Sequence, residues 1–183
     1  MGNQELELKP TRDKHLEPSH KEKIPVKVQI LIISDSLSKL KEKEREKLDI
    51  SSKIAINLVK DAGFNPEGPR FVADEIDQIQ NVIHTAVKEE AQLVIAIGGT
   101  GLAKRDITIE ALKPLFTKEL PGFGELFRHL TYQEIGTVAL MTRATAGIIA
   151  NTVITCLPGS PNAVKLGVPL ILKEIVHILM HIK

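Results

Sequence analysis

Aromatic side chains and charge of one sign are both scarce in this 183-residue sequence. It has no Trp, one Tyr and five Phe, and its formal net charge is +1. Proteins that bind nucleic acids usually carry a basic excess, and those that bind single strands stack the bases on aromatic rings. The composition therefore argues against a nucleic-acid-binding function.

Cysteine and long apolar runs are also rare. The single cysteine, Cys156, excludes an intrachain disulfide, as is usual in reducing compartments, and its apolar surroundings place it in the core. The charged N-terminus has no apolar segment of the kind found in signal peptides. No apolar run reaches the roughly 18–20 residues needed to cross a bilayer. We therefore expect a cytoplasmic protein that is not bound to a membrane.

The chain is predicted to form one domain behind a short tail. Its length suffices for one hydrophobic core, and 43% hydrophobic and 26% charged residues are ordinary globular values. Residues 1–24 are highly charged, lack apolar periodicity and are expected to be disordered. Residues 25–183 then form the domain.

Apolar segments alternate with amphipathic ones along this domain. Val26–Ser34 and residues 92–99 are apolar on both faces, as strands of a parallel sheet are. Between them, one helix is predicted to end at Gly63, and a second to begin at Asp74. The other predicted elements are a short extended piece within 64–72, helices over 131–141 and 163–182, and a strand over 152–157. The alternation predicts an α/β fold with a mostly parallel sheet.

Three loops are expected at the carboxyl ends of the strands, where such folds bind ligands: Ser34–Ser36, Gly98–Asp106 and Leu157–Asn162. The most informative is Ile97–Asp106, IGGTGLAKRD. Its glycines Gly98, Gly99 and Gly101 would let main-chain N–H groups surround an anion, and Thr100, Lys104 and Arg105 add a hydroxyl and positive charge. The alternative is a tight turn without a ligand. The loop matches neither the dinucleotide fingerprint nor the Walker phosphate loop.

Two aspartates stand close to the expected loops. A carboxylate at Asp106 would repel phosphate unless Mg²⁺ bridged them, and Mg²⁺ prefers carboxylate and phosphate oxygens. The alternative for Asp106 is an N-cap of a helix that begins near Thr108. For Asp74, the residues alone favour an N-cap over a site role.

The last loop follows the strand predicted over 152–157. In Pro158-Gly159-Ser160, the glycine permits unusual main-chain angles, and the serine can cap the next helix or bind an anion. The alternative is a simple turn from strand to helix. On the final helix, His177 and His181 are four residues apart, but they do not form the H-E-x-x-H pattern, and no metal site is expected there.

Four segments in this order resemble the MoaB/MogA family of molybdenum-cofactor biosynthesis. They are GGTGLAKRDITIEAL, PGFGELFR, EIGTVALMTRATAG and LPGSPNAVKLG, and the third is more similar to the MoaB branch. The resemblance covers the chain from about Val26 onward. It implies a three-layer α/β/α domain that binds molybdopterin and assembles as a trimer or hexamer.

The resemblance also implies an activity and a set of residues. Active members adenylylate molybdopterin with Mg²⁺ and ATP and release pyrophosphate. A downstream metal-insertion protein would be a partner, and the metal would be molybdenum or tungsten. The alternative is a non-catalytic protein of this family that binds or carries molybdopterin. The implied site residues are Asp106 as the Mg²⁺ ligand, Asp74 on the pterin side, Ser34 and Asp35 after the first strand, Gly98, Gly99, Thr100, Gly101 and Arg105 in the glycine-rich loop, and Pro158, Gly159 and Ser160.

The region after the first strand departs from the family pattern, and its basic stretch Lys39–Lys47 looks lengthened or altered. Members often carry D-x-S-G after the first strand, whereas here Ser52 stands in place of the glycine in Asp49-Ile50-Ser51-Ser52. We also expect the apolar residues of the segment Glu134–Gly147 and of the final helix to supply an interface between copies.

Overall fold

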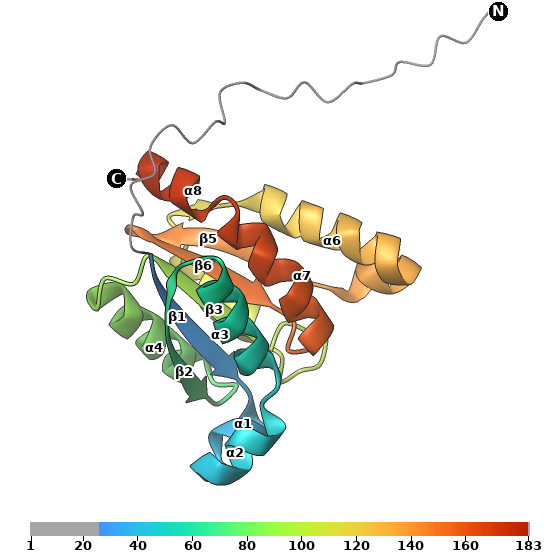
Figure 1. Ribbon diagram of the computed structural model, residues 1–183. Helices are drawn as coiled ribbons and strands as arrows, with labels where there is room; N and C mark the ends of the chain where they lie inside the picture. Colours follow the sequence, from blue (N-terminus) through green and yellow to red (C-terminus); the bar gives the residue numbers. More distant parts are fainter. Residues whose placement is uncertain (1–25, 183) are drawn as a thin grey trace, which may run out of the picture.

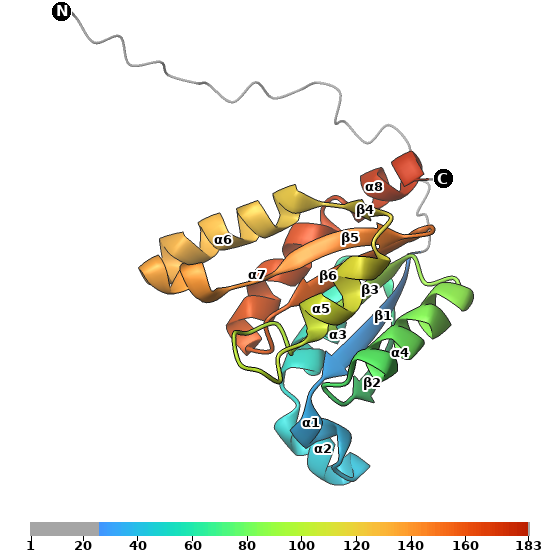
Figure 2. The same cartoon turned by 180° about the vertical axis from the view of Figure 1, so that it is seen from behind.

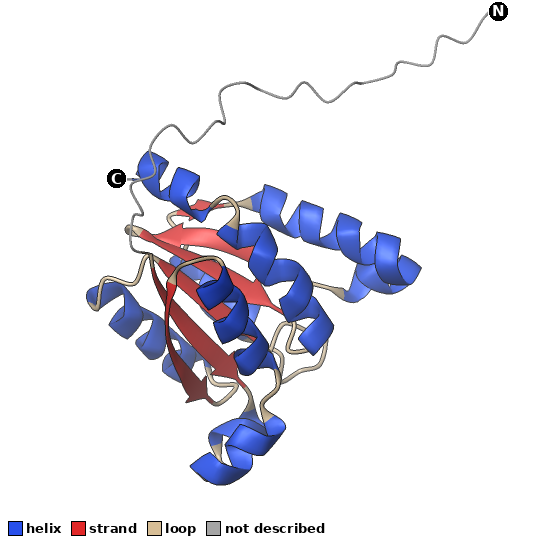
Figure 3. Cartoon of the chain, in the orientation of Figure 1, coloured by secondary structure: helices blue, strands red, loops and turns tan. Residues whose placement is uncertain are grey.

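A six-stranded sheet forms the middle layer of the structure, a computed structural model that describes residues 26–182 (Figure 3). The strand order is β2-β1-β3-β6-β5-β4, with the first four strands parallel and the last two antiparallel to their neighbours. The strands are β1 (Lys27–Ile33), β2 (Asn65–Val72), β3 (Leu93–Ile97), β4 (Lys118–Glu119), β5 (Thr145–Ile149) and β6 (Thr152–Leu157). The predicted α/β fold with a mostly parallel sheet is confirmed.

Helices cover both faces of this sheet, which gives the expected three layers. They are α1 (Asp35–Ser38), α2 (Glu42–Leu48), α3 (Ser51–Asp61), α4 (Ile76–Lys88), α5 (Thr108–Leu112), α6 (Pro121–Ile135), α7 (Pro161–Leu172) and α8 (Ile175–Ile182), with 3₁₀ helices η2 (Lys113–Leu115) and η3 (Gly136–Met141). α3 and α7 lie in front of the sheet in Figure 1, and α4 and α5 lie on the opposite face in Figure 2.

The core consists of two apolar clusters, one on each face of the sheet. Along β1, Val28, Ile30 and Ile32 pack toward α3 and α7, whereas Leu31 and Ile33 pack toward α4. Because successive side chains of a strand point to opposite faces, a strand covered on both sides is mostly apolar. This explains the wholly apolar sequence of β3 and the mostly apolar sequence of β1. Cys156 lies in the second cluster, and burial raises the pKa of its thiol to about 12.

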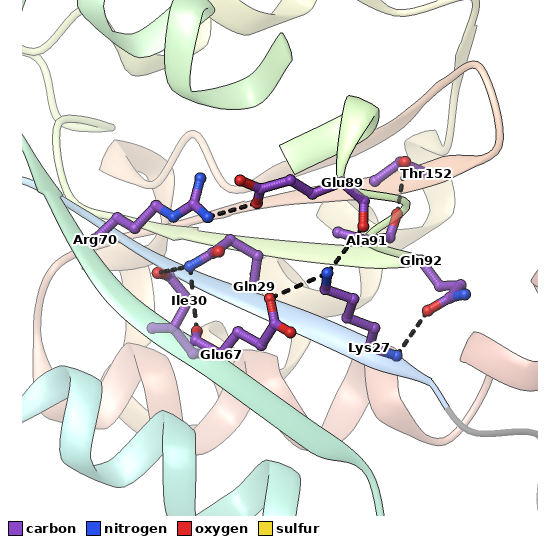
Figure 4. A network of polar contacts seen from close by, with 9 residues as sticks. All are labelled: Lys27, Gln29, Ile30, Glu67, Arg70, Glu89, Ala91, Gln92 and Thr152. Carbon is purple, nitrogen blue, oxygen red and sulfur yellow. Dashed lines mark hydrogen bonds and ion pairs between the residues drawn. The ribbon is translucent and has the colours of Figure 1, made fainter. Parts of the chain in front are cut away.

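One polar side chain, Gln29, is buried within β1 (Figure 4). The pairing of β1 with β2 shifts register between Gln29 and Leu31, which leaves main-chain groups without a partner strand group. The Gln29 amide donates to the carbonyls of Glu67 at 3.1 Å and Ile30 at 2.8 Å. The buried amide therefore satisfies main-chain acceptors at the irregularity.

The helix predicted over 131–141 has other bounds. α6 begins at Pro121, ten residues earlier than predicted, and residues 136–141 form the separate 3₁₀ helix η3. Proline suits the first position of a helix, and Gly136, with a φ of 68°, adopts an angle that ends α6. The glycines after Pro121 concealed this start in the sequence.

The single helix predicted over 163–182 is also wrong. α7 ends at Leu172, and α8 begins at Ile175. The break lets α8 lie near the amino ends of β3 and β6, where Leu179 borders a cavity together with Gln92 and Thr152. The apolar spacing continues through the break, so the sequence pattern gave no sign of it.

No helix within residues 26–182 is long and apolar enough to span a bilayer. The tail predicted over residues 1–24 lies outside the described residues.

Candidate active site

The three predicted loops meet at the carboxyl ends of the parallel strands. Ser34–Ser36 follows β1, Gly98–Asp106 follows β3, and 158–162 follows β6. Two cavities open between these loops, with volumes of about 480 and 410 Å³. The three loops therefore lie together at the end of the sheet that the sequence predicted for them.

The glycine-rich loop packs closely against its neighbours. Gly98 has a φ of 107° and Gly99 a φ of 60°, both in the region that favours glycine. A Cβ atom on Gly98 would collide with the carbonyl of Ile33, and one on Gly99 would lie 2.7 Å from a carboxylate oxygen of Asp74. The glycines are therefore needed both for the turn and for the close approach to β1 and Asp74.

Asp106 closes the far end of this loop and does not cap a helix. Its Oδ2 accepts a hydrogen bond from the main-chain N–H of Ala103 at 2.8 Å. The N-cap of α5 is Ile107, which has no side-chain capping bond, so the N-cap interpretation of Asp106 is wrong. The carboxylate can turn back into the loop because Gly101 has no side chain. A Cβ atom at Gly101 would lie 2.6 Å from Oδ2 and would block this position.

Asp74 does not cap a helix either. The N-cap of α4 is Glu75, again without a side-chain bond. The Oδ2 of Asp74 instead accepts from the main-chain N–H of Asp35 at 2.9 Å. Burial raises the pKa of the Asp74 carboxyl, opposed in part by this hydrogen bond, while the nearby charges of Asp35 and Asp106 raise it further and Arg105 lowers it. An acid whose pKa is shifted by burial beside other charges is a typical feature of a functional site.

The two cavities share a boundary but differ in character. Gly99 and Asp106 line both of them. The smaller cavity is otherwise mainly polar, and its lining includes the predicted residues Ser34, Asp35, Asp74 and Arg105. The larger cavity has a mostly apolar wall from α6, η3 and α7, opposite Thr100 and Gly101, and its lining includes Pro158, Gly159 and Ser160. The predicted site residues are thus divided between two compartments that meet at Asp106.

The loop after β6 joins the other two loops. Ser160 is the N-cap of α7, and its hydroxyl accepts from the N–H of Ala163 at 3.2 Å, as its position predicted. The carbonyl of Gly159 accepts from the Ser51 hydroxyl at 2.7 Å. Ser160 is exposed at the rim of the larger cavity, so a ligand there would meet the start of α7.

The departure at Ser52 fits the structure. The side chain is buried, its N–H donates to Oδ1 of Asp49 at 3.0 Å, and its hydroxyl donates to Oδ2 of the same carboxylate. Asp49 is itself buried at the start of α3. The serine that replaces glycine thus stabilises the carboxylate beside it.

Sequence reasoning missed several residues of the site. The wall of the larger cavity includes Thr131, Ile135, Val138 and Met141, which the sequence indicated only as parts of a helix or an interface. It also includes Phe127, from the segment Glu119–Leu130, for which substrate contact and a structural or interface role were both open. The sequence also gave no indication of Arg143, which contacts the glycine-rich loop. No local pattern reveals these residues because they come from elements distant in sequence from the loop.

The carboxylates at these loops are candidate ligands for a metal ion. Within residues 26–182, no three His, Cys, Asp or Glu side chains are arranged to hold a metal ion by themselves. Asp106 nevertheless fits Mg²⁺, which is commonly held by one or two carboxylates together with substrate phosphates and water.

Fold and site together are those of a three-layer α/β domain with a glycine-rich loop and two cavities at the carboxyl ends of its parallel strands. The chain belongs to the molybdopterin-binding domain family, because residues 29–177 match the family described as a probable molybdopterin binding domain. The predicted resemblance is thereby confirmed.

Named relatives lie within the same family. The chain is 41% identical over 169 residues to molybdenum cofactor biosynthesis protein B of Bacillus subtilis (strain 168), covering 90% of this chain and 95% of that protein. It is 47% identical over 116 residues to molybdopterin adenylyltransferase of Pyrococcus furiosus, covering 61% of this chain and 68% of that protein. Among solved structures, the tungsten cofactor synthesizing protein MoaB from Pyrococcus furiosus superimposes with a TM-score of 0.77 and 38% identity, covering 87% of this chain and 98% of that one.

Proposed function

We propose that this chain is a molybdopterin adenylyltransferase of molybdenum or tungsten cofactor biosynthesis. It would transfer AMP from ATP to molybdopterin with the help of Mg²⁺ and release pyrophosphate. The observation that carries the proposal is the meeting of two ligand-sized cavities at Gly99 and Asp106. The names of the relatives, one of which is a molybdopterin adenylyltransferase, support the same reaction.

The reaction needs two phosphorylated substrates in contact. An oxygen of the terminal phosphate of molybdopterin attacks the α-phosphorus of ATP, a new P–O bond forms, and the bond to the departing pyrophosphate breaks. Such transfers depend on positioning and charge neutralisation more than on covalent help from the protein. Two compartments that share one boundary bring the two phosphates together at that boundary.

The protein groups at the boundary suit these tasks. In this proposal, main-chain N–H groups of Gly98–Gly101 bind phosphate oxygens, Arg105 offsets the developing negative charge, and Asp106 holds Mg²⁺. The ion neutralises phosphate charge that the carboxylates would otherwise repel.

Asp74 has a different role in the proposal. Its carboxylate is held by the N–H of Asp35 and lines the polar cavity with Ser34. From this place it orients the pterin-side substrate. The other substrate, ATP, would then place its flat adenine ring against the apolar wall of the larger cavity, at the start of α7.

Assembly is also part of the proposal, as a trimer or hexamer. Several large apolar residues near the end of α6 and in η3 are more than half exposed. They are Tyr132, Ile135, Val138, Leu140 and Met141, the α6–η3 surface. Exposed apolar groups of this kind usually mark interfaces. The final helices contribute less than predicted, because Ile171, Leu172, Ile175 and Leu179 are buried in the core. We further propose a cytoplasmic location and delivery of the product to a metal-insertion protein.

The direct test mixes the purified chain with molybdopterin, ATP and Mg²⁺ and measures adenylylated molybdopterin and pyrophosphate. Both products should appear in equal amounts, and both should require the divalent ion. Binding of molybdopterin without either product would replace the enzyme with the alternative of a non-catalytic carrier.

A further inference from the structure

One arginine outside the glycine-rich loop contacts both ends of that loop. Arg143 lies between η3 and β5, 43 residues beyond Thr100 in the sequence. Its Nε donates to the carbonyl of Thr100 at 3.1 Å, and its Nη2 donates to the carbonyl of Asp106 at 3.1 Å. A single planar guanidinium group thus sets the distance between the start of the loop and the residue that carries the Asp106 carboxylate.

Glu110 holds the other side of the guanidinium group. Its two carboxylate oxygens accept from Nη1 and Nη2, so the pair has the bidentate geometry that arginine favours. The hydrogen bond from Arg143 lowers the pKa of Glu110, and the same contact raises the pKa of Arg143. The side chain of Glu110 is 49% exposed, so the ion pair itself adds little stability. Its effect is to fix the orientation of Arg143.

The rest of the loop has few contacts that could replace this one. Leu102, Ala103, Lys104 and Arg105 are all exposed. The bonds between Ala103 and Asp106 only close the loop on itself. Beyond these, Thr108 donates to the carbonyls of Gly98 and Gly99, and the N–H of Gly98 donates to the carbonyl of Leu157. These bonds secure only the base of the loop, to α5 and β6, and leave the contacts of Thr100 and Asp106 with Arg143 unreplaced.

We propose that Arg143 is a positioning residue that fixes the glycine-rich loop and Asp106 in the geometry needed for phosphate transfer. The inference rests on the proposed function. Within residues 26–182, Arg143 lines neither of the two cavities, whereas its neighbour Thr142 lines the larger one. Arg143 therefore acts through the main chain of the loop and touches no substrate.

The test compares Arg143→Ala with Arg70→Ala. Arg70 forms an ion pair with Glu89 at the far edge of the sheet, and its side chain is 33% exposed, close to the 29% of Arg143 (Figure 4). Loss of the hydrogen bonds from Arg143 to the loop should lower kcat by about 10²-fold, as a misplacement of reacting groups by about 1 Å can. The KM values for ATP and molybdopterin should change little. Arg70→Ala should retain the turnover of the wild type.

A second readout does not depend on activity. Hydrogen exchange of the main-chain amides at 99–106 should be faster in Arg143→Ala and unchanged in Arg70→Ala, because only the first releases the loop. Glu110→Gln keeps the bonds from Arg143 to the loop but removes one of the two acceptors that orient the guanidinium group, so its effects on exchange and turnover should be smaller than those of Arg143→Ala. Arg143→Lys should recover part of kcat, since an ammonium group can reach one carbonyl but not both. If Arg143→Ala does not fold, the Arg143→Lys variant serves for the same comparison.

Three outcomes would each contradict a different part of these proposals. Turnover in Arg143→Ala equal to that in Arg70→Ala, with unchanged amide exchange, would remove the positioning role. Full recovery of kcat in Arg143→Lys would show that the positive charge, and not the two-carbonyl contact of the guanidinium group, is what matters. Absence of adenylylated product from the wild type would defeat the proposed function, and amide exchange alone would then decide whether Arg143 fixes the loop.

Discussion

Asp35 and Asp74 exchange hydrogen bonds, so that each carboxylate accepts the main-chain N–H of the other. The distances are 2.9 Å from Asp35 N to Asp74 Oδ2 and 3.1 Å from Asp74 N to Asp35 Oδ1. The exchange joins the ends of the neighbouring strands β1 and β2. It also places two carboxylates at one wall of the smaller cavity, beside Asp106.

This arrangement predicts opposite effects on stability and activity for Asp74→Asn. Burial raises the pKa of Asp74, so the folded protein binds this proton more tightly than the unfolded chain does. Stability therefore falls as pH rises from the ordinary pKa of 3.8 through the raised value, and the ionised carboxylate is destabilising at pH 7. The amide can still accept from Asp35 N–H.

The variant should accordingly unfold at equal or higher urea concentration than the wild type at pH 7. This difference should disappear below about pH 3.8, while turnover falls strongly. Urea unfolding at several pH values, with turnover at pH 7, measures both. Asp77→Asn, on the exposed first turn of α4, is the matched control. A large loss of stability at pH 7 would assign Asp74 to the fold instead of the site.

The α6–η3 surface predicts assembly. Leu140 is 86% exposed, and we expect a trimer or a multiple of three at micromolar concentration. Leu140→Glu would place a charge in the interface and should shift the mass measured by light scattering toward the monomer. Met180→Glu, on α8 and 58% exposed, should leave the mass unchanged. A wild-type protein that remains monomeric at this concentration would refute the assembly.

The N-terminal segment should be dispensable for folding and binding. Residues 1–22 lack apolar periodicity, so their deletion should leave the melting temperature and the affinity for molybdopterin unchanged. Thermal unfolding and ligand titration of the truncated chain measure these quantities. A clear drop in either would show that the segment contacts the domain.

The sequence predicted the parallel part of the fold well because burial on two faces leaves a clear pattern. β3 is apolar throughout and β1 and β6 mostly so, and glycines mark the loop after β3. β5 was missed because it is short and contains Gly147, where a Cβ would collide with the ring of Phe116. Its turn uses Ala150 with a φ of 52°, a position at which Gly or Asn is the usual signal.

The site was predictable where its residues lie next to one another in sequence. The loop Gly98–Asp106 and the loop at Ser160 were found from their own patterns. The N-cap favoured for Asp74, and given as the alternative for Asp106, is wrong, because both residues precede helices but bond to Asp35 and Ala103 instead. Arg143 was missed since its contacts to Thr100 and Asp106 depend on the tertiary fold.

Asp106→Asn tests the central claim most directly. Asn can still accept from Ala103 N–H, so the loop and the fold should be preserved, while the negative charge that would hold Mg²⁺ is lost. Losing a key electrostatic group costs about 3–4 kcal/mol, or roughly 10²–10³-fold in turnover. Asp61→Asn, at the exposed end of α3, is the control and should match the wild type.

The deciding measurement is the rate of adenylylated molybdopterin formation, with molybdopterin affinity, on the wild type and Asp106→Asn. We predict that the variant loses at least about two orders of magnitude in rate and binds molybdopterin as tightly as the wild type or more tightly. A variant that retains near-normal, Mg²⁺-dependent turnover would contradict the account.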